Sequence, residues 1–190
     1  MALILASTSS IRCQMLNAAG VEFTSIKPQV DEDKVKVSGK TASAIASELA
    51  ERKAASIDGH DWVIGSDSVV SVADQLFSKP RDRNEARDHL HYFSGRMMHL
   101  TSAVALAHRG SVDWSHSETA KLAVRELSDD FIETYLDAEW PEVSYTVGVF
   151  RMEGRGVQLF SSIDGDHFAI LGMPLVPLLG ALRDRGLMVR

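Results

Sequence analysis

The feature that most constrains the fold is the stretch at residues 61–70, in which one carboxylate stands among apolar, strand-forming residues. The β-branched valines and isoleucine on both sides of Asp67 suit a buried sheet. We expect this strand to be broken at its middle by a turn of small polar residues that carries Asp67. A carboxylate in such surroundings needs a cationic partner, which a metal ion or a charged substrate group would supply. An Asx-turn at a strand end is the alternative, and this segment alone leaves both interpretations open.

The start of the chain combines an apolar run, a hydroxyl-rich turn and a helix start. Ser9 or Ser10 can cap a helix over residues 11–19. Backbone N–H groups, the positive end of the helix dipole and hydroxyls such as that of Ser7 then converge, which favours an anion. Arg12 falls in the first helical turn, where a cation suits the dipole only if an anion binds nearby. A plain capped helix is the other interpretation, and a Walker loop is excluded because its glycines and Gly-Lys-Ser/Thr ending are missing.

Two more charged residues have two possible readings each. Glu32 stands in an acidic triplet at residues 31–33, which is typical of a solvated loop but would also offer hard oxygen ligands to Mg²⁺. Lys53 falls in the last turn of a helix predicted over residues 41–57. There it complements the helix dipole, and a contact with phosphate is the alternative interpretation.

The remaining elements predict the fold class. Helices are expected over residues 82–93, 129–138 and 174–185, and strands over residues 3–6, 97–107, 111–125 and 157–163. Strands and helices are mixed without strict βαβ alternation. We therefore expect an α/β protein with a mixed sheet, flanking helices and two lobes around a cleft.

Charge and composition narrow the functional classes. A net charge of −6 over 190 residues argues against general nucleic-acid binding. The single cysteine, Cys13, rules out an intrachain disulfide and suits a reducing compartment. The apolar N-terminal run lacks the features of a signal peptide, and no stretch has the length of a membrane span. We expect a soluble cytoplasmic protein that does not associate with membranes.

Short motifs occur in a fixed order along nearly the whole chain. They stand at residues 5–12, 31–32, 51–54, 63–70, 79–80, 94–95, 101–106, 148, 153–154 and 172–175. This ordered set resembles the Maf family of nucleoside triphosphate pyrophosphatases, although no single motif is diagnostic.

The resemblance implies one Maf-like domain over residues 1–190, with a curved central sheet and an active-site cleft between two lobes. It implies hydrolysis of a nucleoside triphosphate to the monophosphate and pyrophosphate, a divalent cation (Mg²⁺ or Mn²⁺) and a homodimer. It also implies a house-cleaning role in removing modified nucleotides. A nucleotide-binding regulator of cell division without turnover and a phosphomonoesterase are the rival hypotheses.

The resemblance also assigns roles to individual residues. Asp67 matches the catalytic acid of the family, and we expect it to act as a general base or as the base on a metal, with Glu32 helping to hold the ion. The phosphates are expected to contact Ser7, Ser9, Arg12, Lys53 and Lys79.

The base preference depends on the run at residues 146–154, which differs from the run typical of the pyrimidine branch of the family. Its Phe150, basic residue and Glu153 are more similar to the branch that acts on 7-methyl-GTP. A carboxylate such as Glu153 can accept hydrogen bonds from the N1–H and N2–H₂ groups of guanine. A positively charged methylated purine also favours stacking on Phe150 or on a tryptophan. Val147 and residues 161–164 depart from the commonest forms of that branch.

Overall fold

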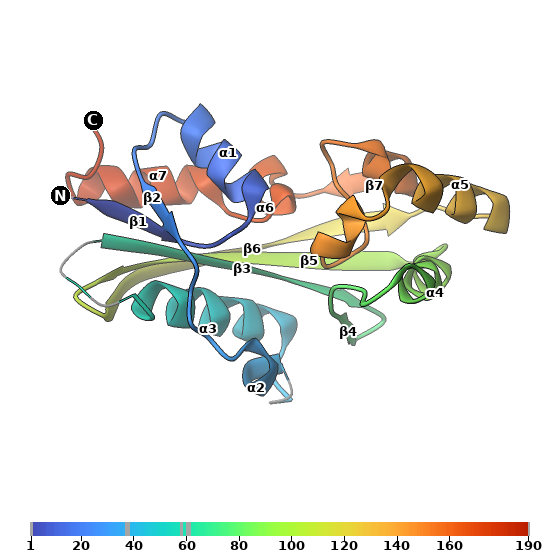
Figure 1. The fold of residues 1–190 in the computed structure, drawn as a ribbon, viewed down its shortest axis with the longest axis horizontal. Helices are drawn as coiled ribbons and strands as arrows, with labels where there is room; N and C mark the ends of the chain where they lie inside the picture. Colours follow the sequence, from blue (N-terminus) through green and yellow to red (C-terminus); the bar gives the residue numbers. More distant parts are fainter. Residues whose placement is uncertain (1, 37–38, 58, 60–61, 190) are drawn as a thin grey trace. The chain divides into compact units, whose positions relative to one another are not determined.

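A mixed sheet of seven strands organises the chain, as described by a computed structural model of residues 2–36, 39–57, 59 and 62–189 (Figure 1). The strands are β1 (Leu3–Ala6), β2 (Thr24–Ile26), β3 (Trp62–Val72), β4 (Gln75–Phe77), β5 (Met97–His108), β6 (Ser111–Val124) and β7 (Phe160–Asp164). Their order is β2-β1-β3-β5-β6-β7, with β4 paired to β3. β1 is parallel to β2 and β3, whereas the β3–β4 and β6–β7 pairs are antiparallel. The predicted mixed α/β class is confirmed.

Helices flank this sheet. They are α1 (Ser10–Ala18), α2 (Glu32–Lys36), α3 (Ala42–Ala55), α4 (Arg83–Phe93), α5 (Asp129–Glu139), α6 (His167–Leu171) and α7 (Leu175–Asp184), with 3₁₀ turns η1 (Glu142–Tyr145) and η2 (Arg155–Leu159). Side chains of Thr41, Asp82 and Ser128 cap α3, α4 and α5 by accepting a bond from the backbone N–H three residues on. In the part of the chain described, no helix combines the length and apolarity needed to cross a membrane.

The chain divides into two compact units. The first comprises the described residues up to Ser68, residues 101–119 and those from Asp166 onward; the second comprises residues 69–100 and 120–165. The cleft expected between two lobes stays a prediction.

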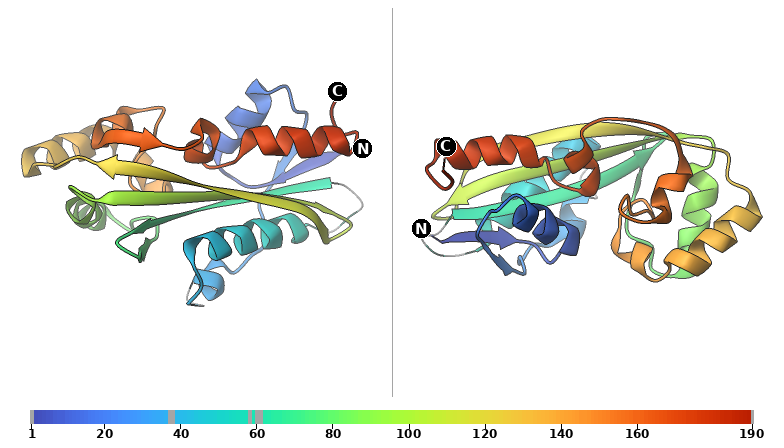
Figure 2. Two further views of the ribbon diagram at one scale, coloured as in Figure 1. Left: turned by 180° about the vertical axis from the view of Figure 1, so that it is seen from behind. Right: turned by 90° about the horizontal axis from the view of Figure 1, so that it is seen from above.

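The first unit packs helices on both faces of its part of the sheet. α1 and α7 lie on one face and α3 on the other, as two opposite views agree (Figures 1 and 2). Leu5 of β1, Leu16 of α1, Ile64 of β3, Leu106 of β5 and Leu178 of α7 are fully buried in one shared core cluster. This core fixes the carboxyl end of β1 and the middle of β3. The residues predicted to bind phosphate follow β1, and the predicted catalytic acid Asp67 lies in β3.

The second unit contains a pair of contacting helices, α4 and α5, beside the β3–β4 and β6–β7 pairs. Arg83 of α4 donates to Glu133 (2.8 Å) and to Asp137 (2.5 Å) of α5, and Arg87 also pairs with Glu133. Because these carboxylates are 42 and 75% exposed, the ion pairs orient the two helices more than they stabilise them.

The prediction of a turn at Asp67 is wrong. β3 runs without interruption from Trp62 to Val72, so Asp67 lies inside a strand, and both the mid-strand break and the Asx-turn are excluded. Small polar residues in a strand resemble turn residues in sequence, but here their side chains bond to neighbouring elements. Ala73 (φ 48°) and Asp74 (φ 62°) form the turn of the hairpin that joins β3 to β4. Asp61, the first residue of the motif, lies outside the described residues.

Three local predictions also need correction. Ser9 occupies the N-cap position of α1, but its side chain makes no capping bond. The acidic triplet is not an open loop, because α2 begins at Glu32. The strand predicted from Val157 starts only at Phe160, because a 3₁₀ turn precedes it. In that turn a Cβ on Gly156 would lie 2.5 Å from the Arg151 carbonyl oxygen, so the chain folds back closely instead of extending.

Gly65 explains how α3 reaches the sheet. A Cβ built on Gly65 would lie 2.1 Å from the carbonyl oxygen of Ala50 and 2.3 Å from the amide nitrogen of Ala54. The backbone of α3 therefore packs directly on β3, which no residue with a side chain would allow at this position. Lys53, in the last turn of α3, is brought to the sheet by the same contact.

We expect Gly65→Ala to lower the free energy of unfolding by about 3 kcal/mol, because the added methyl group must separate two backbone segments in a packed core. Urea denaturation measures this loss. Gly180→Ala in α7 is the matched control, since nothing lies within 4 Å of its added Cβ. That control should be neutral or gain up to about 1 kcal/mol from helix propensity. Equal stabilities of the two variants would contradict the close approach of α3.

Candidate active site

Asp67 and its neighbours point to alternate sides of β3, as side chains in a strand do. The carboxylate of Asp67, whose residue is 6% exposed, contacts Lys53 of α3. Ser66 and Ser68 instead both donate to the carbonyl oxygen of Gly172, at 3.1 and 3.2 Å. One strand therefore presents an acid to one element and two hydroxyls to another.

A buried ion cluster joins α2, α3 and β3. Lys53 Nζ lies 2.5 Å from Asp67 Oδ1 and 2.7 Å from Glu32 Oε1. The side chains of Lys53 and Asp67 are only 8 and 9% exposed, whereas that of Glu32 is 40% exposed. Lys53 thus supplies the cation that the Asp67 carboxylate requires, in addition to its favourable position in the last turn of α3.

Arg12 is held by neutral acceptors. Its Nε donates to the Gly172 carbonyl oxygen (2.9 Å) and its Nη2 to Ser68 Oγ (3.1 Å). Ser68 Oγ also lies 2.8 Å from Ser102 Oγ, which fixes the hydroxyl. A guanidinium carries five N–H donors, so these two bonds orient it without using its full capacity for an anion.

The charges of the ion cluster also reach Arg12. Burial lowers the pKa of the Arg12 guanidinium, while the carboxylates of Asp67 and Glu32 act in the opposite direction. Lys53 brings Asp67 and Glu32 together, and Ser68, the residue after Asp67 in β3, bonds to Arg12.

The hydroxyl turn before α1 lies in the same unit. Ser7 is buried, and its Oγ accepts a bond from the backbone N–H of Ser9 at 3.2 Å. Since the Ser9 side chain makes no capping bond, and no acidic residue stands in the first turn, the N-terminus of α1 keeps its positive character. The anion site expected at the carboxyl end of β1 stays a prediction.

Glu32 and Asp67 are the residues suited to a divalent cation. Both present hard carboxylate oxygens to one shared cation, Lys53 Nζ, so their geometry fits an ion that takes one or two protein carboxylates and completes its shell with phosphate and water. Among the described residues, no three histidine, cysteine, aspartate or glutamate side chains gather as a metal site.

The other predicted site residues belong to the second unit. Lys79 is exposed and follows β4, and Glu153 is exposed in the segment between η1 and η2. Phe150 is 7% exposed and packs edge-to-face on Phe160, with ring centroids 5.0 Å apart. Their grouping with the first six residues stays a prediction, and the burial of Phe150 disfavours its assigned role in stacking on a base.

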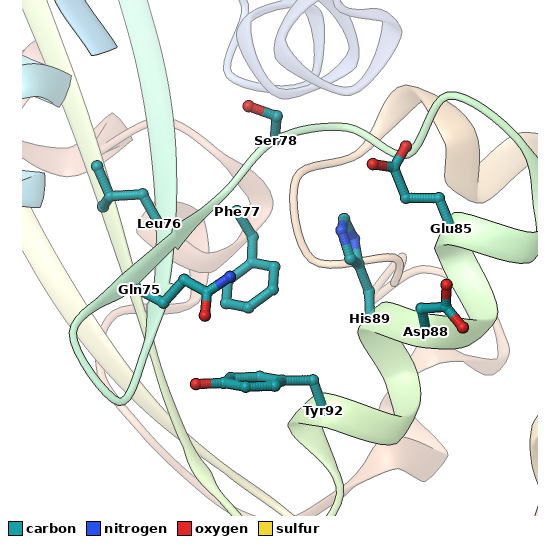
Figure 3. Close-up of a pocket in the computed structure, with 8 residues that line it drawn as sticks. All are labelled: Gln75, Leu76, Phe77, Ser78, Glu85, Asp88, His89 and Tyr92. Atoms are coloured by element: carbon teal, nitrogen blue, oxygen red, sulfur yellow. The ribbon is translucent and has the colours of Figure 1, made fainter. Parts of the chain in front are cut away.

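A hollow of about 440 Å³ lies between β4 and α4 in the second unit (Figure 3). Phe77 and Tyr92 pack together at its floor, with ring centroids 5.2 Å apart, and Glu85 and Asp88 lie along one wall. Burial lowers the pKa of His89 at the same wall, so this histidine favours its neutral form. An acidic hollow without arginine or lysine in its lining does not suit a triphosphate.

Two residues of the sequence motifs, Gly172 and Ser68, bond to predicted site residues in a way that the sequence did not predict. Gly172 provides the carbonyl that Arg12, Ser66 and Ser68 share, and Ser68 anchors the guanidinium directly. Both stand in motifs quoted for the family, so position within a motif was the available signal. These roles depend on contacts between residues 56 to 160 positions apart in sequence, which no local pattern reveals.

Comparisons with known proteins find a matching family model, similar chains and a similar fold. Residues 2–185 match the family described as Maf-like protein. A nucleoside triphosphate pyrophosphatase of Granulibacter bethesdensis is 46% identical over 191 residues, covering 97% of each chain. A 7-methyl-GTP pyrophosphatase of Rhizobium meliloti is 41% identical over 191 residues, covering 97% of this chain and 96% of that one. The solved Staphylococcus aureus Ham1 protein shares the fold alone, with a TM-score of 0.52, 13% identity and coverage of 98% of this chain and 100% of that one.

We expect Lys53→Gln to lower the free energy of unfolding by about 3 kcal/mol, because it leaves the buried Asp67 carboxylate without a cation. Urea denaturation at neutral pH measures the loss. Lys40→Gln is the matched control, since Lys40 pairs with Glu48 on the surface and should contribute less than about 1 kcal/mol. A loss for Lys53→Gln no larger than that of the control would mean that the ion pair is not buried as described.

Proposed function

This chain belongs to the Maf-like protein family, and on that premise we propose that it hydrolyses nucleoside triphosphates to the monophosphate and pyrophosphate. In this reaction a water oxygen bonds to the α-phosphorus, and the bond from the α-phosphorus to the α,β-bridging oxygen breaks. Pyrophosphate leaves with the electrons of that bond. The observation that carries the proposal is the buried contact of Lys53 with Asp67 and Glu32.

Asp67 is the proposed general base. Its position inside β3 and its contact with Lys53 of α3 hold the carboxylate in place, where it would accept the proton of the attacking water. Lys53 shares this carboxylate in the free protein. In the complex the ammonium of Lys53 is proposed to bind a phosphate oxygen instead, which leaves the Asp67 oxygen to the water.

The phosphates are proposed to bind along the turn before α1. The N–H groups at the start of α1, the hydroxyls of Ser7 and Ser9 and the guanidinium of Arg12 offer donors to phosphate oxygens. Lys79 keeps its predicted role as a further phosphate contact. Fixed donors of this kind stabilise the negative charge that builds up on the leaving pyrophosphate.

A divalent cation, Mg²⁺ or Mn²⁺, is proposed to be held by Glu32 and Asp67. When bound, it would neutralise phosphate oxygens and lower the pKa of a bound water. The residues of this chain support such an ion with two hard oxygen donors, and the phosphates would complete its shell. A homodimer and a house-cleaning role toward modified nucleotides stay predictions of the family resemblance.

Among nucleoside triphosphates, we propose that the protein prefers those with a guanine-type base. Glu153 is an exposed carboxylate, and such a group accepts from the N1–H and N2–H₂ edge that thymine and uracil lack. The relative from Rhizobium meliloti named 7-methyl-GTP pyrophosphatase supports this preference. The relative from Granulibacter bethesdensis has the broader name.

We expect Asp67→Asn to lower the rate of pyrophosphate release by about 10³-fold while nucleotide binding persists, because the variant keeps the shape of the side chain but loses the proton acceptor. Coupled pyrophosphate detection and equilibrium dialysis with the nucleotide measure the two properties. Asp113→Asn is the matched control, because Asp113 pairs with Arg185 on the surface of the same unit.

The outcomes separate the rival functions. Full activity in Asp67→Asn would remove this aspartate from the chemistry. Nucleotide binding by the unaltered protein without any turnover would favour the non-catalytic regulator of cell division. Release of orthophosphate in place of pyrophosphate would identify a phosphomonoesterase.

We expect 7-methyl-GTP to be hydrolysed with a higher kcat/KM than dTTP or UTP, by about tenfold or more, because the pyrimidines lack the donors that pair with Glu153. A nucleotide panel with Mg²⁺ and with Mn²⁺, scored for pyrophosphate, measures the preference. Glu153→Gln should reduce it selectively. A preference for the pyrimidines would defeat the assignment of Glu153 and leave the pyrophosphatase proposal intact.

A further inference from the structure

The segment that carries Phe150 and Glu153 has an unusual backbone. Val149 has a φ of 56°, a left-handed conformation that is costly for a β-branched residue, and Gly148 before it has a φ of 153°. A Cβ on Gly148 would lie 2.7 Å from the Phe150 ring. A chain holds such a conformation only when its surroundings enforce it. The question is therefore which residues hold this segment in place.

Tyr135 of α5 provides the first anchor. Its hydroxyl donates to the carbonyl oxygen of Val149 at 2.9 Å, and the residue is only 3% exposed. Burial and the carboxylate of Glu139 both raise the pKa of the Tyr135 hydroxyl, so it stays protonated and able to donate. This bond fixes the left-handed residue to the helix.

Glu139, at the end of α5, provides the second anchor. It is 5% exposed, and its Oε2 accepts from Arg151 Nε (3.3 Å) and Nη2 (3.1 Å). Its Oε1 accepts from the backbone N–H of Arg155 at 3.2 Å. A Cβ on Gly154 would lie 3.0 Å from Glu139 Oε2, so the turn passes directly over the carboxylate.

Glu153, the residue proposed to recognise the base, lies between two residues that are bonded to Glu139. Glu139 holds Arg151 and Arg155, and the N–H of Gly154 closes the turn onto the Arg151 carbonyl at 3.2 Å. Glu153 lies inside this turn with its side chain exposed, and no contact of its own restrains it among the described bonds. An exposed carboxylate selects a partner well only when its backbone is rigid.

We propose that Glu139, assisted by Tyr135, is a positioning residue for nucleobase selectivity: it fixes the turn of residues 151–155 so that Glu153 meets a guanine-type edge in one orientation. The inference rests on the proposed function, because a nucleotide must bind for Glu153 to read its base. Glu139 itself is buried beneath the turn and acts through it.

Binding of analogues that resist hydrolysis tests this role separately from catalysis. Isothermal titration calorimetry with Mg²⁺ gives the dissociation constants of the α,β-methylene analogues of GTP and UTP, and of inorganic tripolyphosphate, which has no base. We expect Glu139→Gln to reduce the preference for the GTP analogue by about tenfold, the size of one weakened charge-assisted bond. Binding of tripolyphosphate should not change, and amide exchange at residues 152–154 should accelerate.

Two further variants complete the test. Glu133→Gln is the matched control: it lies on the same helix and makes the same charge change, but it pairs with Arg83 and Arg87 and not with this segment. It should keep the preference of the unaltered protein. Tyr135→Phe removes the other anchor with little change in side-chain volume. If Glu139→Gln does not fold, the base preference of Tyr135→Phe tests the inference instead.

Each outcome is decisive. An unchanged ratio of the two dissociation constants in both Glu139→Gln and Tyr135→Phe would overturn the inference, even if amide exchange accelerates. Equal binding of the GTP and UTP analogues by the unaltered protein would also overturn it. A lost preference in a protein that binds but never hydrolyses nucleotides would uphold the inference and refute the pyrophosphatase proposal.

Discussion

The buried contact between Lys53 and Asp67 sets the conditions for the first unit. A carboxylate in the interior of β3 is costly unless a cation lies beside it, and that cation comes from the last turn of α3. The helix can deliver it only by packing its backbone on the strand, which the absence of a side chain at Gly65 permits. Helix packing and charge pairing are therefore one constraint, and neither can change without the other.

The charges around this contact are unequal. Lys53 contacts two carboxylates, those of Asp67 and Glu32, while Arg12 is bonded to neutral acceptors. A triphosphate adds several negative charges, and a lysine already paired to two carboxylates does not neutralise it. The proposed function thus calls for added positive charge, and the two carboxylates are the groups able to attract it. The same acids that bind Lys53 in the free protein would then face a divalent cation.

Sequence patterns predicted the regular elements well and the contacts of the site poorly. Helix caps at Thr41, Asp82 and Ser128 are local signals, and those helices begin where predicted. Periodicity could not show that β3 passes through Asp67, since small polar residues also form turns. The buried partner of Lys53 and the triple use of the Gly172 carbonyl depend on elements distant in sequence. The family resemblance named the residues, and the fold supplies the contacts among those of the first unit.

Relatives with different names match this chain about equally well, at 46 and 41% identity, so identity over the whole chain does not identify the base. The residues of the first unit that are proposed for catalysis and phosphate binding lie on or beside helices and strands. Glu153 instead lies in an irregular segment whose shape depends on α5. Such a segment can change without disturbing the sheet. A change at Glu139 would alter the turn while leaving every residue of the turn the same. Base preference should therefore follow the end of α5 together with the segment, and comparison of the segment alone would misassign it.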